Sequence, residues 1–263
     1  MATSVSDPQQ RKQHVQTTTE ALRDQLGPLP SVGLIVADGD APDALSLGDT
    51  CASASLPHGP DAGQWSMGTS EASQVVVFTD GPTLYDGHAA QAMAFPVQMM
   101  GAVGVDVLCL LGSAEPVAPT LSAGECVLVS DHINFQGTNP LVGPNIDDWG
   151  PRFPDMSMPY DPDLRARAKA AAREKGLPLS EGVYWGAVGP TAHTDAEDHM
   201  ARTLGADAVG HTGVTEVIAA RHMGLRVCSM VVMVGGDEQD GRADAGRLLV
   251  TVVDEIQQPA ETV

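Results

Sequence analysis

Short runs of apolar residues alternate along the chain with longer segments in which apolar residues recur every three to four positions. The first pattern predicts strands and the second predicts helices. Strands are expected at 32–36, 75–78, 107–111, 126–130, 182–187, 208–210 and 226–234, and helices at 17–26, 89–103, 162–175, 194–204, 215–223 and 242–257. Several of the strand runs are continuously apolar, which is typical of strands buried on both faces. This alternation predicts one layered α/β domain.

Local signals support several helix ends and one long connection. Thr194, followed three residues later by Glu197, has the spacing of a capping box, and Gly176 and Gly224 stand where helices are expected to end. The segment 134–161 is rich in Pro, Gly and Asn, so it is expected to lack regular structure. A connection of this length inside a compact domain is usually functional or lies at an interface.

The composition limits the classes of partner. The 263 residues include 43% hydrophobic and 18% charged residues, which is enough for one large domain with a sizeable core. We therefore expect a domain at 31–257, preceded by a polar segment and helix at 1–30 and followed by a tail at 258–263. A formal charge of −20 argues against DNA or RNA binding, which needs Lys and Arg to neutralise phosphates.

Signals for export, membrane insertion and metal binding are missing from the sequence. Residues 1–16 are polar, and no apolar run is long enough to span a bilayer, so we expect a cytoplasmic protein with no membrane partner. The four cysteines are widely spaced and form no CxxC pair, which favours buried, reduced cysteines over a metal site or disulfides. We expect no metal and no other cofactor.

Collinear motifs from about Val32 to about Val253 carry a resemblance to a known family. They include GVDVL at 104–108, VLVSDHIN at 127–134, NPLVGPN at 139–145, RFPDMS at 152–157, EGVY at 181–184, GPT at 189–191, LGADAVG at 204–210, EVIAARH at 216–222 and GLRV at 224–227. Together these blocks resemble the trimeric purine nucleoside phosphorylases. The resemblance implies a single-domain nucleoside phosphorylase-like α/β fold, with a mixed central sheet flanked by helices, and a homotrimer that binds a nucleoside-like small molecule. The reaction has to be argued from individual positions, because fold and activity can separate.

Two of the segments with which the resembled family binds phosphate are changed here. The first strand runs into a loop with Asp38, Asp40 and Asp43, where the family has a Gly- and Ser-rich loop whose amides and hydroxyls converge on the anion. After the next strand, Gly81 and Thr83 stand at the family's Arg and His positions. Like charges a few ångströms apart repel by about 1 to 4 kcal/mol, so we expect this loop to repel phosphate.

A third segment and one hydroxyl retain more of the family pattern. The family's Asn-Ala-Ala-Gly-Gly turn reads Gly-Ser-Ala-Glu-Pro at 112–116, where the amide of Ser113 is still available as a donor. Thr212 stands at the position of a phosphate-binding hydroxyl. The resemblance therefore assigns Ser113 and Thr212 to the ligand site.

The subsites for the base and the ribose also carry substitutions. His193 replaces the family's base-reading acid, His211 replaces the Met beneath the sugar, and Tyr85 matches a ribose contact. The Asn that hydrogen-bonds the leaving base falls at Gly235. Trp149, in the long connection, occupies the place of an aromatic that closes the neighbouring subunit's active site, and structural packing at an interface is the alternative.

Three functions are compatible with these substitutions. In the first, water replaces phosphate as the nucleophile, Asp40 or Asp80 acts as the base, and His193 protonates the departing nucleobase, so that the protein is an N-ribosyl hydrolase. In the second, ribosyl transfer is retained with a different acceptor. In the third, the chain is a non-catalytic homologue that serves as a ligand-binding or structural and assembly subunit. Our working hypothesis is chemistry at the N-glycosidic bond without ordinary phosphate-dependent cleavage.

The other histidines are expected to be mainly structural. His132 lies in a family-like structural segment, and His222, at the end of a helix, is expected to cap it or lie at the surface. His58 lies near a Pro-Gly-His loop of the family, but the residues that follow disturb the match, so a structural role is favoured. Asp86 matches a common acidic position of the family and is also expected to be structural.

Overall fold

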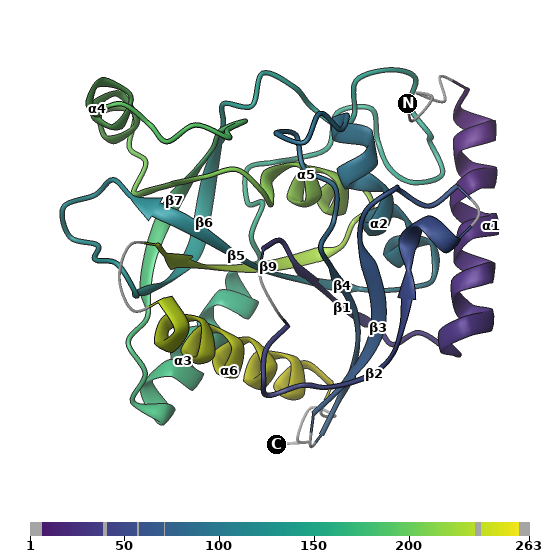
Figure 1. Cartoon of the computed structure of the whole chain (residues 1–263), viewed down its shortest axis with the longest axis horizontal. Helices are drawn as coiled ribbons and strands as arrows, with labels where there is room; N and C mark the ends of the chain where they lie inside the picture. The colour runs from purple at the N-terminus through teal and green to yellow at the C-terminus, as the bar shows by residue number, and fades with distance from the viewer. Residues whose placement is uncertain (1–6, 39–40, 57, 71, 235–237, 258–263) are drawn as a thin grey trace.

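The strands of the chain form one mixed sheet with helices on both faces (Figure 1). The computed structural model describes residues 7–38, 41–56, 58–70, 72–234 and 238–257, with only the backbone at 238–242 and 257. In these residues the strands are β1 Val32–Val36, β2 Ser46–Ala52, β3 Gln64–Thr69, β4 Gln74–Thr79, β5 Val107–Pro116, β6 Cys126–Asn134, β7 Ser180–Gly186, β8 Ala208–Gly210 and β9 Arg226–Met233. The helices are α1 Pro8–Leu26, α2 Ala90–Ala102, α3 Pro162–Lys175, α4 Asp195–Thr203, α5 Val214–His222 and α6 Glu238–Gln257, with a short 3-10 turn at Ser53–Ser55. The expected α/β domain with a mixed sheet is confirmed.

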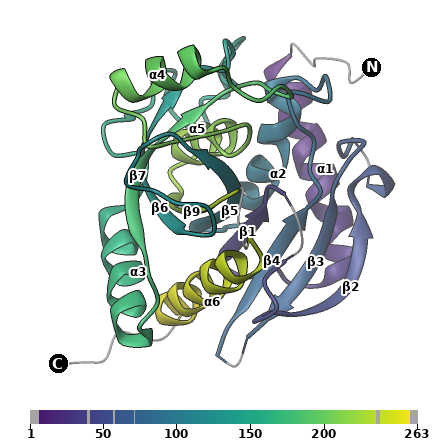
Figure 2. The same cartoon turned by 60° about the vertical axis from the view of Figure 1, so that its left-hand side comes forward.

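The sheet is open at one end and curls on itself at the other. Its strand order is β2-β3-β4-β1-β5-β8-β7-β6-β9, and β9 also pairs with β5. That additional pairing closes β5, β8, β7, β6 and β9 into a ring, whose curvature is visible in Figure 2. Because β1 is parallel to both β4 and β5, the chain leaves these three strands at the same edge of the sheet. In open α/β sheets, this carboxyl edge is where ligand sites are built.

Alternate residues of the central strands enter different hydrophobic clusters. Leu34 and Val36 pack in the cluster that contains the apolar faces of α3 and α6. Ile35, between them, packs in the cluster that contains α1, α2 and α5. This alternation follows from the two-residue period of a strand. The continuously apolar run of β1 is therefore explained by a sheet that is covered on both faces.

In the amino-terminal half of the chain, one predicted helix begins earlier than expected and two strands are present that were not predicted. Helix α1 begins at Pro8 rather than at residue 17, because the Asp7 side chain accepts a hydrogen bond from the backbone N–H of Gln9 and caps the helix. Strands β2 and β3, which form an antiparallel edge hairpin, were not predicted. Most residues of β2 are exposed, so this strand has no continuous apolar run that would reveal it.

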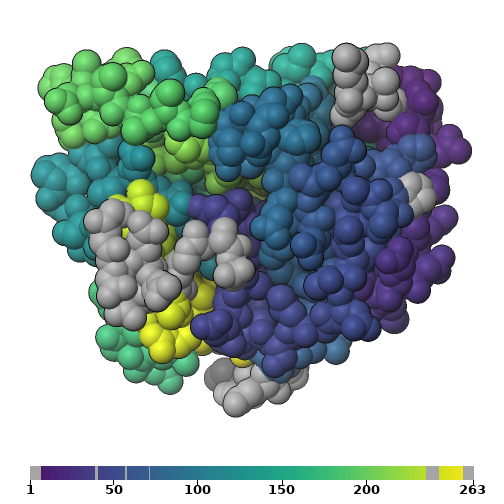
Figure 3. Space-filling view, in the orientation of Figure 1, coloured from purple at the N-terminus to yellow at the C-terminus, as the bar shows by residue number. Residues whose placement is uncertain are grey.

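The predicted helix ends and the long connection are confirmed. The Thr194 side chain accepts from the backbone of Glu197, and the Glu197 side chain accepts from the backbone of Thr194, which completes the capping box of α4. Gly176 adopts the left-handed conformation after α3, with φ 65°. Residues between β6 and α3 contain no helix or strand. Helix α4 projects at a corner of the surface away from α1 (Figure 3).

The four cysteines match the prediction of buried, reduced thiols. All four cysteines are buried and free, and burial raises the pKa of the Cys126 thiol to about 12, which keeps it protonated. None of the helices in the described residues is long and apolar enough to cross a membrane.

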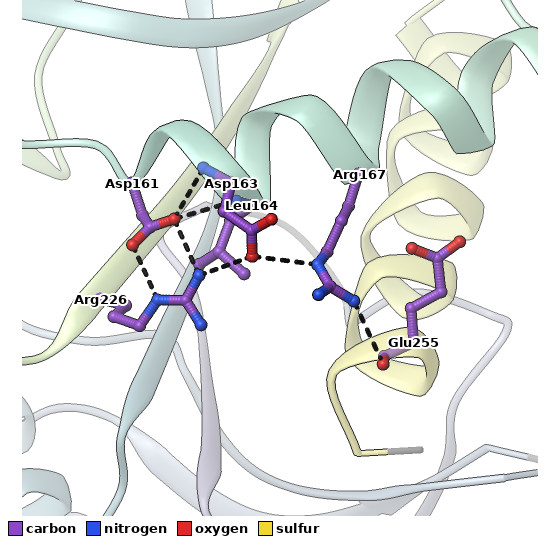
Figure 4. A network of polar contacts seen from close by, with 6 residues as sticks. All are labelled: Asp161, Asp163, Leu164, Arg167, Arg226 and Glu255. Atoms are coloured by element: carbon purple, nitrogen blue, oxygen red, sulfur yellow. Dashed lines mark hydrogen bonds and ion pairs between the residues drawn. The ribbon is translucent and has the colours of Figure 1, made fainter. Parts of the chain in front are cut away.

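A polar network fastens α3 to β9 and to α6 (Figure 4). Asp161 caps α3 by accepting hydrogen bonds from the backbone of Asp163 and Leu164, and it also accepts two hydrogen bonds from the Arg226 guanidinium, at 2.7 and 2.9 Å. Arg167 donates to Asp163 and to the backbone carbonyl of Glu255 in α6. The hydrogen bonds from Arg226 are the largest cause that lowers the pKa of the Asp161 carboxyl.

Two replacements of Asp161 distinguish the contribution of its helix cap from the contribution of its charge. Asp161→Ala removes both and is expected to lower the free energy of unfolding by about 2 kcal/mol, whereas Asp161→Asn retains an N-cap and loses less. Because the folded-state pKa of Asp161 is lowered, its stabilisation is present above the ordinary pKa and is lost as the pH falls through the folded value. Urea unfolding of the three proteins at about pH 7 and about pH 3 should show both differences shrinking at the lower pH. Equal stability of all three at neutral pH would contradict this role.

Candidate active site

Three segments meet at the carboxyl edge of the central strands. Asp38 follows β1, Gly112 and Ser113 lie in β5, and Thr212 follows β8. A Cβ atom built on Gly112 would lie 3.5 Å from Asp38 Oδ1 and 3.6 Å from Thr212 Oγ1, so these groups surround one point. The Ser113 hydroxyl donates a hydrogen bond to the Asp38 carboxylate. The structure therefore brings the predicted residues Ser113 and Thr212 together and joins Ser113 to a carboxylate of the chain itself.

Tyr184 holds the backbone of Thr212 in place. This tyrosine was not predicted as a site residue from the sequence. Its hydroxyl donates to the carbonyl of Thr212 at 2.9 Å and accepts from the backbone N–H of Thr212 at 3.4 Å. Burial raises the pKa of Tyr184, so the hydroxyl stays protonated and remains a donor. The EGVY motif that ends at Tyr184 was the available signal, but the motif alone does not show which way the ring points.

Three aromatic side chains assemble beside this point. The rings of His193 and His211 stack with centroids 5.7 Å apart, and the Tyr85 ring meets His211 edge-on at 6.2 Å. His193 Nδ1 lies 3.7 Å from Glu115 Oε2. The structure thus brings together three residues that the sequence placed at the ribose and base subsites.

His211 and its surroundings favour a neutral imidazole. Burial is the first cause that lowers the pKa of His211, and the charge of His193 lowers it further, while the backbone of Ala187 and the charge of Glu115 act in the opposite direction. Gly189, with φ 74°, leaves space for the ring, because a Cβ there would lie 2.9 Å from His211 Nδ1. A neutral His211 can pack against an uncharged ligand ring without adding a positive charge.

The groups described above, from Asp38, Ser113 and Thr212 to Tyr85, His193 and His211, are called the cleft from here on. A small cavity of about 10 Å³ adjoins the cleft at Thr212. Its lining includes Gly81 and Thr83 after β4, Thr212 after β8, and Glu216 in the first turn of α5. Glu216 is 6% exposed, and burial raises the pKa of its carboxyl to about 7, against the opposing effect of the backbone N–H groups of Glu216 and Gly213. Sequence reasoning missed Glu216, because in the motif EVIAARH it reads as one polar position in a helix.

Three predicted site residues remain, and the structure describes two of them. Asp40 falls outside the described residues. Asp80 is exposed, has a positive φ of 53°, and accepts a hydrogen bond from the Thr79 hydroxyl at 3.3 Å. Trp149 is half-buried against the cluster of α1, α2 and α5, in a pocket that it shares with Arg11 and His222. Their roles in the site therefore stay predictions.

His132 and His222 have structural hydrogen-bond partners, and the prediction for His222 needs a correction. His132 Nδ1 lies 3.1 Å from the Tyr160 hydroxyl, as expected of a structural residue. His222 was expected to cap a helix or lie at the surface, but it is buried, and its Nε2 lies 3.0 Å from Asn145 Oδ1. The surface prediction was wrong because the loop 135–161 covers the end of α5. The described residues contain no group of three or more His, Cys, Asp or Glu side chains arranged to hold a metal.

The mixed sheet with its closed ring and the polar cleft at its strand ends define the α/β fold of nucleoside phosphorylases. A family model described as the phosphorylase superfamily matches residues 31–262. The chain belongs to this superfamily, within the purine nucleoside phosphorylase family.

Named relatives agree with this assignment in sequence and in structure. Purine nucleoside phosphorylase 1 of Bacillus subtilis (strain 168) is 37% identical over 230 residues, which cover 82% of this chain and 83% of the relative. The rat (Rattus norvegicus) purine nucleoside phosphorylase is 45% identical over 149 residues, 55% of this chain and 52% of the relative. The Schistosoma mansoni purine nucleoside phosphorylase superposes with a TM-score of 0.86 at 27% identity, covering 94% of this chain and 98% of that one. A Schistosoma enzyme in complex with guanosine superposes with a TM-score of 0.83 at 29% identity, covering 95% and 98%.

Proposed function

We propose that this chain acts on the N-glycosidic bond of a nucleoside-like ligand, with water rather than phosphate as the nucleophile. Support for the ligand class comes from the family and from the Schistosoma relative that was solved with guanosine. The ligand would lie across the cleft, its sugar near Tyr85 and His211 and its base near His193. Ser113 and Thr212 would face the side of the sugar opposite the departing base. We further propose a homotrimer in which Trp149 closes the site of a neighbouring subunit.

The observation that carries the change of nucleophile is the hydrogen bond from Ser113 to Asp38. A hydroxyl at the nucleophile side of the cleft is already engaged by an anion of the chain. An incoming phosphate would have to displace this carboxylate and would be repelled by its charge, by about 1 to 4 kcal/mol at a few ångströms. Water meets neither obstacle, since it is neutral and can both donate and accept hydrogen bonds.

His193 is the residue that we assign as the general acid. Cleavage leaves electron density on the departing nucleobase, and a proton donor beside the base lowers the barrier. The Glu115 carboxylate lies 3.7 Å from His193 Nδ1, and the pKa of the neighbouring His211 is lowered, first of all by burial. The sequence-based choice for the base that activates water was Asp40 or Asp80, and it remains a prediction.

The proposed function predicts base release that does not depend on phosphate. Purified protein is incubated with inosine, guanosine and adenosine, with and without inorganic phosphate, and the free base and the sugar product are quantified. We expect equal rates in both conditions, with free ribose as the product. His193→Gln should lower the rate about 100-fold or more, as expected for loss of a general acid, while the exposed His199→Gln serves as the matched control and leaves it unchanged.

The other functions predict different results in the same assay. Release that requires phosphate and yields ribose 1-phosphate would overturn the change of nucleophile. Release that requires a different added acceptor would indicate altered ribosyl transfer. No release from any nucleoside, together with no thermal shift on nucleoside addition, would favour the non-catalytic subunit.

A further inference from the structure

We propose that Glu216 is the general base that removes a proton from the attacking water, an inference that rests on the hydrolytic function proposed above. Glu216 lies in the first turn of α5, four residues after Thr212, and both residues line the same small cavity. Thr83, which follows β4, completes the polar part of that lining. The carboxylate therefore sits beneath the side of the cleft from which a nucleophile would approach.

The cavity has the size and the polar lining that one water molecule needs. Its volume of about 10 Å³ is about the space for one water centre. A buried water typically makes two to four hydrogen bonds, and the lining includes three residues with polar side chains, Thr83, Thr212 and Glu216. The Thr83 hydroxyl donates to the Asp86 carboxylate at 2.6 Å and accepts from the backbone N–H of Asp86 at 3.3 Å, which leaves one lone pair to accept from water. The sequence at this point carries Gly81, whose missing side chain is required because a Cβ would lie 2.7 Å from the Phe78 ring.

The Glu216 carboxylate is free to accept a proton from that water. Its Oε2 is buried and has no hydrogen-bond partner among the described residues. A buried acceptor without a partner is costly, and a water that donates to this oxygen would remove that cost. Of the other carboxylates considered, Asp80 is exposed, and Asp38 already accepts a hydrogen bond from the Ser113 hydroxyl.

The surroundings of Glu216 match what a base at neutral pH requires. The elements packed around it present mostly apolar or neutral side chains to the cavity, with Ile35 from β1 and Met93 from α2. The titratable groups that sense its charge are Tyr184 of β7 and Tyr160 of the loop before α3, and Asp38 acts on the same Tyr184. Both tyrosines are buried with raised pKa values and stay neutral. The most effective general base has a pKa near the working pH, and burial brings the Glu216 carboxyl to that range.

The reaction balances with these two residues. The water oxygen forms a bond to the anomeric carbon of the ribose, and the water proton passes to the Glu216 carboxylate. The electron pair of the glycosidic C–N bond leaves with the nucleobase, which takes a proton from His193. Glu216 then releases its proton to solvent and His193 regains one, so that the net change is nucleoside plus water to ribose plus base.

The test compares Glu216→Gln with the exposed Glu174→Gln of α3 in the phosphate-free assay with inosine, from about pH 5 to about pH 9. Wild-type protein and Glu174→Gln should show a rate that rises with pH through about 7. Glu216→Gln should lower kcat about 100-fold or more, with KM little changed, and its residual rate should lack that rise. Circular dichroism of the variant checks its folding. If Glu216→Gln does not fold, Glu216→Asp, which keeps a displaced carboxylate, should fold and retain the pH-dependent rise at a reduced rate.

Each alternative outcome has a distinct meaning. If wild-type protein releases base but Glu216→Gln keeps its rate and its pH profile, the assignment of Glu216 is overturned while the hydrolytic function stands. If Asp80→Asn removes the pH-dependent rise and Glu216→Gln does not, the base is Asp80. A rate loss in Glu216→Gln that keeps the pH rise would show a structural role only. If wild-type protein releases no base, the hydrolytic function fails, and the catalytic role of Glu216 fails with it.

Discussion

Gly210→Ala is expected to lower the free energy of unfolding by about 3 kcal/mol and to abolish nucleoside binding. A Cβ at this position would lie 2.2 Å from the Tyr184 hydroxyl and 2.9 Å from the carbonyl oxygen of Ser113. The second contact is with backbone, which cannot swing aside as the end of a flexible side chain can. The methyl group must therefore separate β8 from β5 or expel Tyr184 from its hydrogen bonds with Thr212.

A matched substitution tests whether the effect comes from adding a methyl group to the site or from adding it at residue 210. Gly112→Ala adds the same group in the same cleft, but its nearest neighbours outside the adjacent residues lie at 3.5 Å or more, which is ordinary contact distance. We expect Gly112→Ala to fold with a stability within about 1 kcal/mol of wild type and to weaken ligand binding by filling the space between Asp38 and Thr212. Urea unfolding and nucleoside-induced thermal shift measure the two effects. If Gly210→Ala is as stable as wild type, the hydrogen bonds of Tyr184 do not fix the backbone of Thr212.

Glu216→Gln is expected to change how stability depends on pH. The folded-state pKa of Glu216 is raised from its ordinary value of 4.5 to about 7, so the folded chain binds this proton more tightly than the unfolded chain does. Its contribution to stability is fully present below the ordinary pKa and is lost as the pH rises to the folded value. The loss is about 3 kcal/mol over that range, and glutamine, which does not ionise, avoids it. Relative to wild type, Glu216→Gln should therefore gain about 3 kcal/mol of stability between about pH 4 and about pH 8.

The measurement is urea unfolding of both proteins across this pH range. Taking the difference between the two proteins cancels the titration of all other groups. The exposed Glu174→Gln should show no such difference from wild type. A difference between Glu216→Gln and wild type that stays constant with pH would show that the carboxyl has its ordinary pKa in the folded state, which would contradict burial as the controlling effect.

Regular elements with a strong apolar period were predictable from the sequence, and weakly patterned ones were not. Helix α3 has the predicted bounds, because Asp161 and Pro162 begin it and Gly176 ends it. The bounds of β8 were also predicted correctly. The amino-terminal half of α1 is largely polar, and the exposed residues of β2 carry no apolar run, so both depend on tertiary packing that the sequence pattern does not reveal.

Only some residues of the candidate site could be predicted from the sequence. Tyr85, His193 and His211 were predicted from aligned positions, and the structure brings their rings together. Glu216 was missed because burial, which gives the carboxyl its raised pKa, is a property of the packed helix and has no signature in one polar residue. The hydrogen bond between Asp38 and Ser113 joins residues 75 positions apart, which no local pattern can indicate.

The sequence by itself determined the α/β class, most of the strands and helices, and the family, because apolar periodicity, capping residues and collinear motifs are local or additive signals. Only the tertiary structure decided which polar groups of the cleft face one another and which carboxylate is shielded from water. The physical reason is that hydrogen-bond partners and proton affinities depend on distance and burial in three dimensions, and residues far apart along the chain set both.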